Sequence, residues 1–317
     1  TEQSMGVPII SSMDVEELGR LANGLKVYFD KEAYQADGVI AVNRIKVHTA
    51  FKSDIESGLC KMLAVGLGKH QGATLVHSLG VVGLKDYVVE FADLILEKAP
   101  ILCGIGILED AYDDTCQIMA ARPADIKSTD IALLKKCKQI LPALPVSDID
   151  ILFVHEMGKN ISGTGMDTNI VGGVKGYKEG EYTPPNIKRI IVQDLTEQTK
   201  GNALGVGTAD IITKKLYDKI DIKATYTNTI TATFLDRAKI PMVAATDKEA
   251  LEIALKTIWN LPDTPPRIMM IRNTLKLDEL YVSEPIWNEI KSRPQIETVG
   301  DWVDLEFDSH GELLLSV

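Results

Sequence analysis

Apolar stretches of strand length alternate with longer amphipathic stretches through the first third of the chain. Asn23-Gly24 separates two such stretches and favours a β-hairpin over 16–29, because both residues tolerate a positive φ. The continuous apolar run at 37–47 predicts a buried strand. The same periodicities predict the elements that follow: helices at 54–67, 73–79 and 84–100, the last ended by Pro100, and a strand at 101–109.

A strand, a group of helices and a second strand in this order predict a right-handed crossover between parallel strands. Ligands of parallel sheets bind where the strands end. His48 directly follows the strand predicted at 37–47, so we expect it at a ligand-binding edge of the sheet.

The second half of the chain shows a similar alternation. We expect an α/β fold of two lobes, with mixed or mostly parallel sheets and a cleft between them. The predicted domains are an N-terminal domain at 1–121, a connector at 122–146 that contains a helix, and a C-terminal α/β domain at 147–317. The elements predicted for the last domain are strands at 148–156, 186–195, 267–275 and 302–308, and helices around 208–219 and 247–259.

The amino-acid composition limits the kinds of molecule that the protein can bind. The 317 residues carry 34 basic and 45 acidic side chains, a net charge of −11 that repels phosphate backbones and argues against nucleic acid. The sequence shows neither a long apolar run nor a signal peptide, which predicts a cytoplasmic protein without membrane contact. The chain opens without Met, so we also expect a missing N-terminal segment or a companion chain. Composition leaves the oligomeric state open.

Three residues between 43 and 80 carry the candidate chemistry. His48 follows a strand and titrates near neutrality, as a general acid or base requires; the alternative is a loop histidine bonded to a carbonyl. Lys61 begins an apolar helix after Ser57-Gly58, where a partly dry amine becomes nucleophilic, although most lysines are solvated surface charges. His77 lies in the apolar segment TLVHSL, where it is either a metal ligand or a histidine bonded to a helix carbonyl.

Two later loops follow predicted strands. The glycine-rich loop at 158–173 contains Lys159 and Asn160, and the segment at 194–210 contains Asp194, Lys200 and Asn202. Loops that follow neighbouring parallel strands converge on one edge, so we expect these two to meet. A solvated loop and ordinary helix capping are the alternatives, because neither segment contains a Walker or dinucleotide motif.

The order of His48, Ser57-Gly58-Leu59-Cys60-Lys61 and His77 resembles the N-terminal domain of the nickel-dependent lactate racemase family. Members carry a histidine after a strand, an S-G-G-R-K segment, and a second histidine at the distance that separates Lys61 from His77. Leu59-Cys60 replaces the Gly-Arg of that segment. The resemblance covers roughly residues 37–80.

The resemblance implies a racemase or epimerase of a small 2-hydroxy acid that uses reversible hydride transfer. Lys61 would carry a nickel pincer nucleotide, derived from nicotinic acid, covalently, with Ser57 and Gly58 beside it, and His77 would ligate the nickel. His48 would be the catalytic acid or base, with His70 or His155 as candidates for a second proton carrier.

The substrate carboxylate needs a partner, and our candidates are Lys159, Asn160 and Lys52. One alternative function is a lysine- and histidine-dependent lyase or isomerase of a carboxylated metabolite. A second alternative is a non-catalytic homologue that binds a metabolite or a metal.

Overall fold

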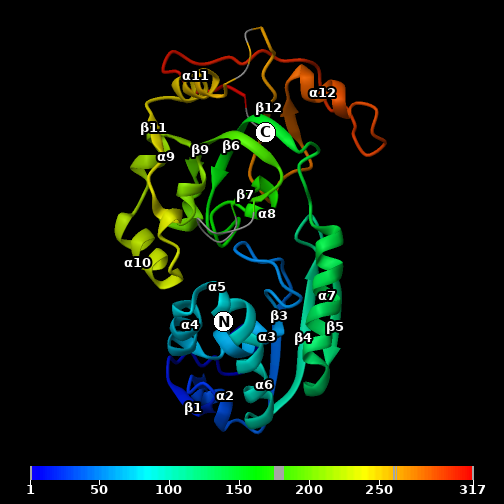
Figure 1. The fold of residues 1–317 in the computed structure, drawn as a ribbon, viewed down its shortest axis with the longest axis vertical. Helices are drawn as coiled ribbons and strands as arrows, with labels where there is room; N and C mark the ends of the chain where they lie inside the picture. The colour runs from blue at the N-terminus through cyan, green and yellow to red at the C-terminus, as the bar shows by residue number, and fades with distance from the viewer. Residues whose placement is uncertain (1, 175–181, 260, 262, 316–317) are drawn as a thin grey trace. The chain divides into compact units, whose positions relative to one another are not determined.

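The computed structural model describes residues 2–174, 182–259, 261 and 263–315. The chain forms two compact units, Thr1–Leu141 and Pro142–Val317. Both units combine strands and helices (Figure 1), so the predicted α/β fold class is confirmed. No helix within the described ranges has the length and apolar character needed to cross a bilayer.

Unit 1 begins with the predicted hairpin. Strands β1 (Val15–Arg20) and β2 (Lys26–Asp30) pair antiparallel, and Gly24 in the turn has a φ of 88°, which glycine adopts without strain. Two short helices flank the hairpin, α1 (Glu2–Met5) and α2 (Lys31–Gln35).

The main sheet of unit 1 has the order β3-β4-β5. Strand β3 (Val39–Arg44) runs parallel to β4 (Ile101–Glu109), which confirms the predicted crossover, and β5 (Thr115–Ala121) returns antiparallel. The sequence analysis does not predict β5. Most of its side chains are exposed or only half-buried, so its hydrophobic pattern is weak.

The crossover contains a chain of short helical segments. They are α3 (Leu59–Lys61), the π-helical turn η1 (Met62–Gly66), α4 (Lys69–Ser78), α5 (Gly80–Val82), the π-helical turn η2 (Gly83–Tyr87) and α6 (Val88–Lys98). The predicted helices are therefore present, but α4 runs through Gly72, where the sequence predicted an interruption. A β-carbon on Gly72 would lie 3.0 Å from the carbonyl oxygen of Ala64, so this glycine lets α4 pack closely against η1.

The helix that the sequence assigned to the connector belongs to unit 1. After the turn η3 (Pro123–Asp125), helix α7 (Ile126–Ile140) packs along β4, and the boundary between the units falls at Leu141 and Pro142. The inward side of α7 supplies buried apolar residues such as Leu133 and Leu134.

Unit 2 contains a six-stranded sheet with the order β11-β10-β9-β6-β12-β13. Every neighbouring pair is parallel except β12 with β13, as expected for a mostly parallel sheet. The strands are β6 (Asp148–Met157), β9 (Asn186–Leu195), β10 (Ile211–Thr213), β11 (Met242–Ala244), β12 (Ile268–Ile271) and β13 (Leu280–Val282).

Apolar side chains cover both faces of this sheet. On β6, Leu152 and Val154 join the cluster that contains residues of α9 and α12, whereas Ile151 and Phe153 join the cluster that contains residues of α11. This two-sided burial explains the continuous apolar run of β6. The other segments of unit 2 are α8 (Thr168–Val171), β7 (Gly173–Val174), β8 (Tyr182–Thr183), η4 (Glu197–Thr199), η5 (Val206–Thr208), α9 (Lys214–Asp218), α10 (Ile222–Ala232), η6 (Leu235–Ala238), α11 (Asp247–Thr257) and α12 (Glu284–Ile290).

Two predictions for unit 2 are wrong in detail. The helix predicted around 208–219 begins with strand β10, and the helical part is limited to α9. The strand predicted at 302–308 is absent: Phe307 forms one isolated bridge with Leu313. Trp302 and Val303 are exposed, so only part of this segment packs on the core.

One carboxylate connects α7 to the start of α3. Asp130 is buried, and its two oxygens accept hydrogen bonds from the backbone N–H groups of Leu59 and Cys60, each at 2.8 Å. Burial raises the pKa of Asp130, while these hydrogen bonds oppose the rise. The carboxylate thus satisfies amide groups at a helix start that lacks a capping side chain of its own.

We expect Asp130→Ala to lower the free energy of unfolding by about 2–4 kcal/mol, because two buried N–H groups lose their acceptor. Urea denaturation measures this change. Asp125→Ala is the matched control, since Asp125 pairs with Arg122 at the exposed start of α7 and should cost no more than about 0.5 kcal/mol. Equal losses for the two variants would contradict the anchoring role.

Candidate functional site

Lys61 lies at the last residue of α3, directly after the two amides that Asp130 holds. Leu59 and Cys60 are fully buried beside it, and Lys61 itself is half-buried. Desolvation lowers the pKa of Lys61 to about 8. A measurable fraction of this amine is therefore neutral near physiological pH, which is the form that acts as a nucleophile.

His77 lies near the end of α4 and is half-buried. Burial lowers the pKa of His77, and the positive charge of Lys61 lowers it further. The imidazole is therefore neutral at physiological pH, as a metal ligand must be. Because the charge of Lys61 acts on His77, the structure brings these two predicted residues into one region of unit 1.

His48 follows β3 and has a defined local environment. Its backbone N–H donates to Glu56 at 2.6 Å, and its ring lies 4.4 Å from the ring of Phe51. The Nδ1 atom accepts from the backbone N–H of Ala50 at 3.1 Å, so the neutral imidazole carries its proton on Nε2. A donor at Nε2 suits a proton carrier. The convergence of His48 with Lys61 and His77 on one cavity stays a prediction.

The residues predicted beside Lys61 have clear structural contacts. The carbonyl of Ser57 accepts a hydrogen bond from the backbone N–H of Lys46 at 2.8 Å. A β-carbon on Gly58 would lie 2.5 Å from an oxygen of Asp130, so this position must be glycine for the anchor to form. These contacts leave the predicted cofactor roles of Ser57 and Gly58 untested, and Lys52 is an exposed side chain whose substrate role is untested too.

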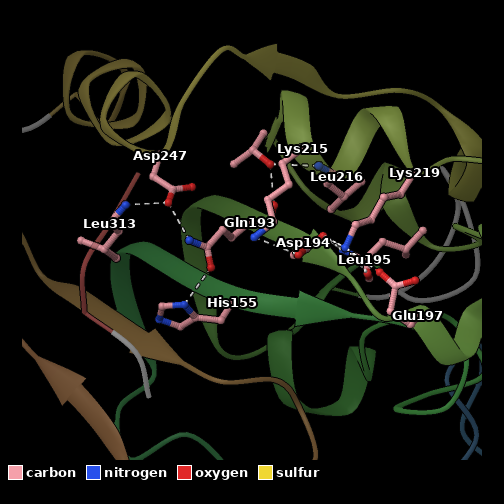
Figure 2. A network of polar contacts seen from close by, with 11 residues as sticks. His155, Gln193, Asp194, Leu195, Glu197, Lys215, Leu216, Lys219, Asp247 and Leu313 are labelled. Atoms are coloured by element: carbon pink, nitrogen blue, oxygen red, sulfur yellow. Dashed lines mark hydrogen bonds and ion pairs between the residues drawn. The ribbon is translucent and has the colours of Figure 1, made fainter. Parts of the chain in front are cut away.

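The two further histidines considered as proton carriers lie in different units. His70 is exposed on α4. His155 lies on β6 of unit 2, where its Nδ1 is 2.9 Å from Gln193 Oε1. Gln193 in turn donates to the buried Asp247 at 2.6 Å (Figure 2). Burial lowers the pKa of His155, although the bond to Gln193 opposes this.

Asp194, near the end of β9, forms ion pairs with two lysines. Lys215 and Lys219 lie 3.0 and 2.9 Å from its carboxylate (Figure 2). Burial alone would raise the pKa of Asp194, but the hydrogen bonds from Lys219 and Lys215 outweigh it, so the pKa is lowered. Asp194 therefore ties strand β9 to α9. Lys200, from the same segment, is exposed in the left-handed turn that ends η4.

The loops after β6 and β9 meet, as the sequence predicts. Asn160 accepts a hydrogen bond from the hydroxyl of Thr196 at 2.5 Å. Lys159 donates from Nζ to Asn228 Oδ1 at 2.7 Å, and Asn202 donates to the same oxygen at 3.3 Å. Asn228 was not predicted from the sequence, because a single asparagine in the polar helix α10 belongs to no motif.

The donor set constrains which metal the protein can hold. No group of three or more His, Cys, Asp or Glu side chains is placed to bind a metal ion in the part of the chain that the structure describes. A nickel ion at His77 would therefore need most of its ligands from a bound organic group. A neutral imidazole beside a nucleophilic amine fits a metal carried by such a group.

The geometry defines an α/β protein of two units in which unit 1 holds a lysine–histidine pair. No protein-family model and no curated protein matches the sequence. Among solved structures, the fold is similar to that of the lactate racemase apoprotein from Thermoanaerobacterium thermosaccharolyticum. That similarity has a TM-score of 0.49 and 16% identity, and it covers 83% of this chain and 67% of the other.

The low pKa of Lys61 means that the free energy of unfolding depends on pH. Below pH 8 both the folded and the unfolded chain carry a charged Lys61, so the folded state bears the full cost of desolvating the cation. Between pH 8 and the ordinary value of 10.5 the folded state loses this charge first, so rising pH relieves the cost.

We expect Lys61→Met to raise the free energy of unfolding at pH 7 by about 1–3 kcal/mol, and the gain to shrink as the pH approaches 10. Denaturant titrations at pH 7 and pH 10 measure the difference. Lys69→Met is the control. Lys69 pairs with Asp30 at 2.5 Å, so this variant should be less stable than the wild type. A destabilised Lys61→Met at pH 7 would contradict the buried, uncompensated amine.

Proposed function

We propose that the chain is an isomerase, a racemase or epimerase of a 2-hydroxy acid, whose site in unit 1 holds a nickel pincer nucleotide. The observation that carries the proposal is the half-buried Lys61 amine, with its pKa near 8, acting electrostatically on the neutral His77 imidazole. This pair supplies a covalent attachment point and a metal ligand at the two positions that the sequence motif predicts.

Three residues of unit 1 would have separate roles in this reaction. Lys61 would hold the group covalently through its amine, and His77 would ligate the nickel through an imidazole nitrogen. When bound, the group supplies a reversible hydride acceptor. His48, whose Nε2 carries the proton while Nδ1 accepts from Ala50, would act as the acid that donates this proton to the substrate oxygen.

The packing around the pair limits its motion and its access to water. Asp130 fixes the amides before Lys61, and Gly72 brings α4 close to η1. A site held on packed helices keeps reacting groups in place better than a loop does. The partly dry surroundings also lower the pKa of both Lys61 and His77, which raises the neutral fraction of each side chain.

A second function follows from the same amine. Lys61 could act directly as an amine catalyst and form a Schiff base with a carbonyl substrate, in a lyase or an isomerase of a carboxylated metabolite. The lowered pKa of Lys61 suits this alternative too, because a Schiff base forms from the neutral amine.

Intact-mass analysis of protein purified from its native source separates the two functions. The racemase proposal predicts a covalent adduct that peptide mapping locates on Lys61, about one nickel per chain, and interconversion of 2-hydroxy acid enantiomers. The Schiff-base alternative predicts an unmodified chain. On that chain, pyruvate with cyanoborohydride should label Lys61, and Lys69 should stay unlabelled because it is paired with Asp30. A native protein with neither nickel nor an adduct would overturn the racemase proposal.

The ligand role of His77 has its own test. We expect His77→Ala to lower the nickel content by about tenfold or more while the adduct on Lys61 persists, because a lost ligand weakens the metal and not the covalent bond. His70→Ala is the matched control on the exposed side of the same helix. Nickel retained at the wild-type level in His77→Ala would count against the ligand role.

A further inference from the structure

The amine of Lys159 in unit 2 is held by a neutral side chain. Lys159 follows the C-terminal end of β6 and is half-buried. Its hydrogen bond from Nζ goes to the neutral amide oxygen of Asn228 at 2.7 Å, and among the described residues no carboxylate forms an ion pair with it. A lysine ammonium has three N–H donors, so two remain for another acceptor.

A second cation acts electrostatically on this amine. The pKa of Lys159 is lowered by burial and also by the positive charge of Arg237 on η6. The guanidinium of Arg237 lies 4.5 Å from the ring centre of Phe234, and the Arg237 backbone carbonyl accepts a hydrogen bond from Gly205 at 2.9 Å. Two positive charges of unit 2 therefore lie within electrostatic range of each other, which favours an anion beside them.

The surrounding groups are donors on three separate segments. Asn202, in the loop after β9, donates its amide to Asn228 Oδ1 at 3.3 Å, so Asn228 on α10 accepts from both Asn202 and Lys159. With its oxygen engaged twice, Asn228 presents its own NH₂ group as a further donor. Amide and ammonium donors together suit a charged oxygen.

The loops themselves are packed closely enough to hold these groups in place. A β-carbon on Gly158 would lie 2.0 Å from the hydroxyl oxygen of Thr196, so the loops after β6 and β9 approach at van der Waals distance. Thr199 accepts from the backbone N–H of Lys159 at 3.3 Å and donates to the carbonyl of Asn202 at 2.7 Å. The position is the C-terminal edge of a parallel sheet, where α/β proteins bind ligands.

We propose that unit 2 contains an anion-binding site, formed by Lys159, Asn228 and Arg237, that takes the carboxylate or phosphate group of a small ligand. The site lies wholly within unit 2 and does not depend on the chemistry proposed for Lys61. It assigns binding roles to Asn228 and Arg237, which neither the sequence motif nor the resemblance includes.

Isothermal titration calorimetry of the full chain in a chloride-free buffer tests this site. The probes are inorganic phosphate and lactate, with lactamide as the uncharged control. Binding of phosphate or of lactate, without binding of lactamide, supports the site, and the preferred probe identifies the oxyanion that it takes. Failure of both anions to bind at millimolar concentrations would overturn it.

Variants locate the bound anion. Lys159→Met should weaken binding by about tenfold or more, since a charge-assisted hydrogen bond is lost, and Asn228→Ala should weaken it less. Lys256→Met, at an exposed lysine of α11, should bind as the wild type does. Without anion, Lys159→Met should melt no lower than the wild type, because a half-buried cation is removed. Unchanged affinity in a folded Lys159→Met would place the anion elsewhere and contradict the proposal.

These results are separable from those for unit 1. A native protein that lacks nickel and an adduct on Lys61, yet binds anions through Lys159, would refute the racemase proposal and leave the anion site standing. The reverse pattern would refute the anion site alone.

Discussion

The candidate site in unit 1 is anchored by one buried carboxylate. Asp130 on α7 accepts the backbone N–H groups of Leu59 and Cys60, and Lys61 is the next residue. This contact joins residues about seventy positions apart in the sequence, so it fixes the start of α3 against a helix that packs on the sheet. The chain following that anchor turns through η1 into α4, and His77 lies on α4.

Each unit keeps a lysine in partly dry surroundings, and no carboxylate in the described ranges forms an ion pair with it. Elsewhere in the chain lysines lie beside acids, as Lys69 does with Asp30 and Lys219 with Asp194. Burial of a cation without a counter-ion costs stability, and such costs concentrate at functional sites. At Lys61 and at Lys159, the chemistry that we propose therefore opposes the stability of the fold.

Much of the fold follows from local patterns. The apolar residues of β6 and of the centre of β9 are buried, and Asn23-Gly24 forms the turn of the predicted hairpin, so periodicity and turn chemistry were sufficient there. Two predictions failed for the same reason: β5 was not predicted, and a strand was wrongly predicted at 302–308. Each segment buries too few side chains for the hydrophobic alternation to indicate its true structure.

The candidate site was predictable only in part. The order of His48, Lys61 and His77 is visible in the sequence, and the loops after two parallel strands converge for topological reasons. The Asp130 anchor and the contact of Asn228 with Lys159 were not predictable, because each joins distant segments through a common residue type that has no motif. Tertiary packing, which sequence periodicity does not encode, produces both.

The most direct measurement is the titration of the Lys61 amine itself. Heteronuclear NMR of lysine side-chain signals, with the Lys61 resonance assigned through its loss in Lys61→Met, follows protonation of this one group with pH. The account predicts a midpoint near pH 8. A midpoint at the ordinary value of 10.5 would mean a solvated amine, and it would remove the basis for covalent chemistry at this residue.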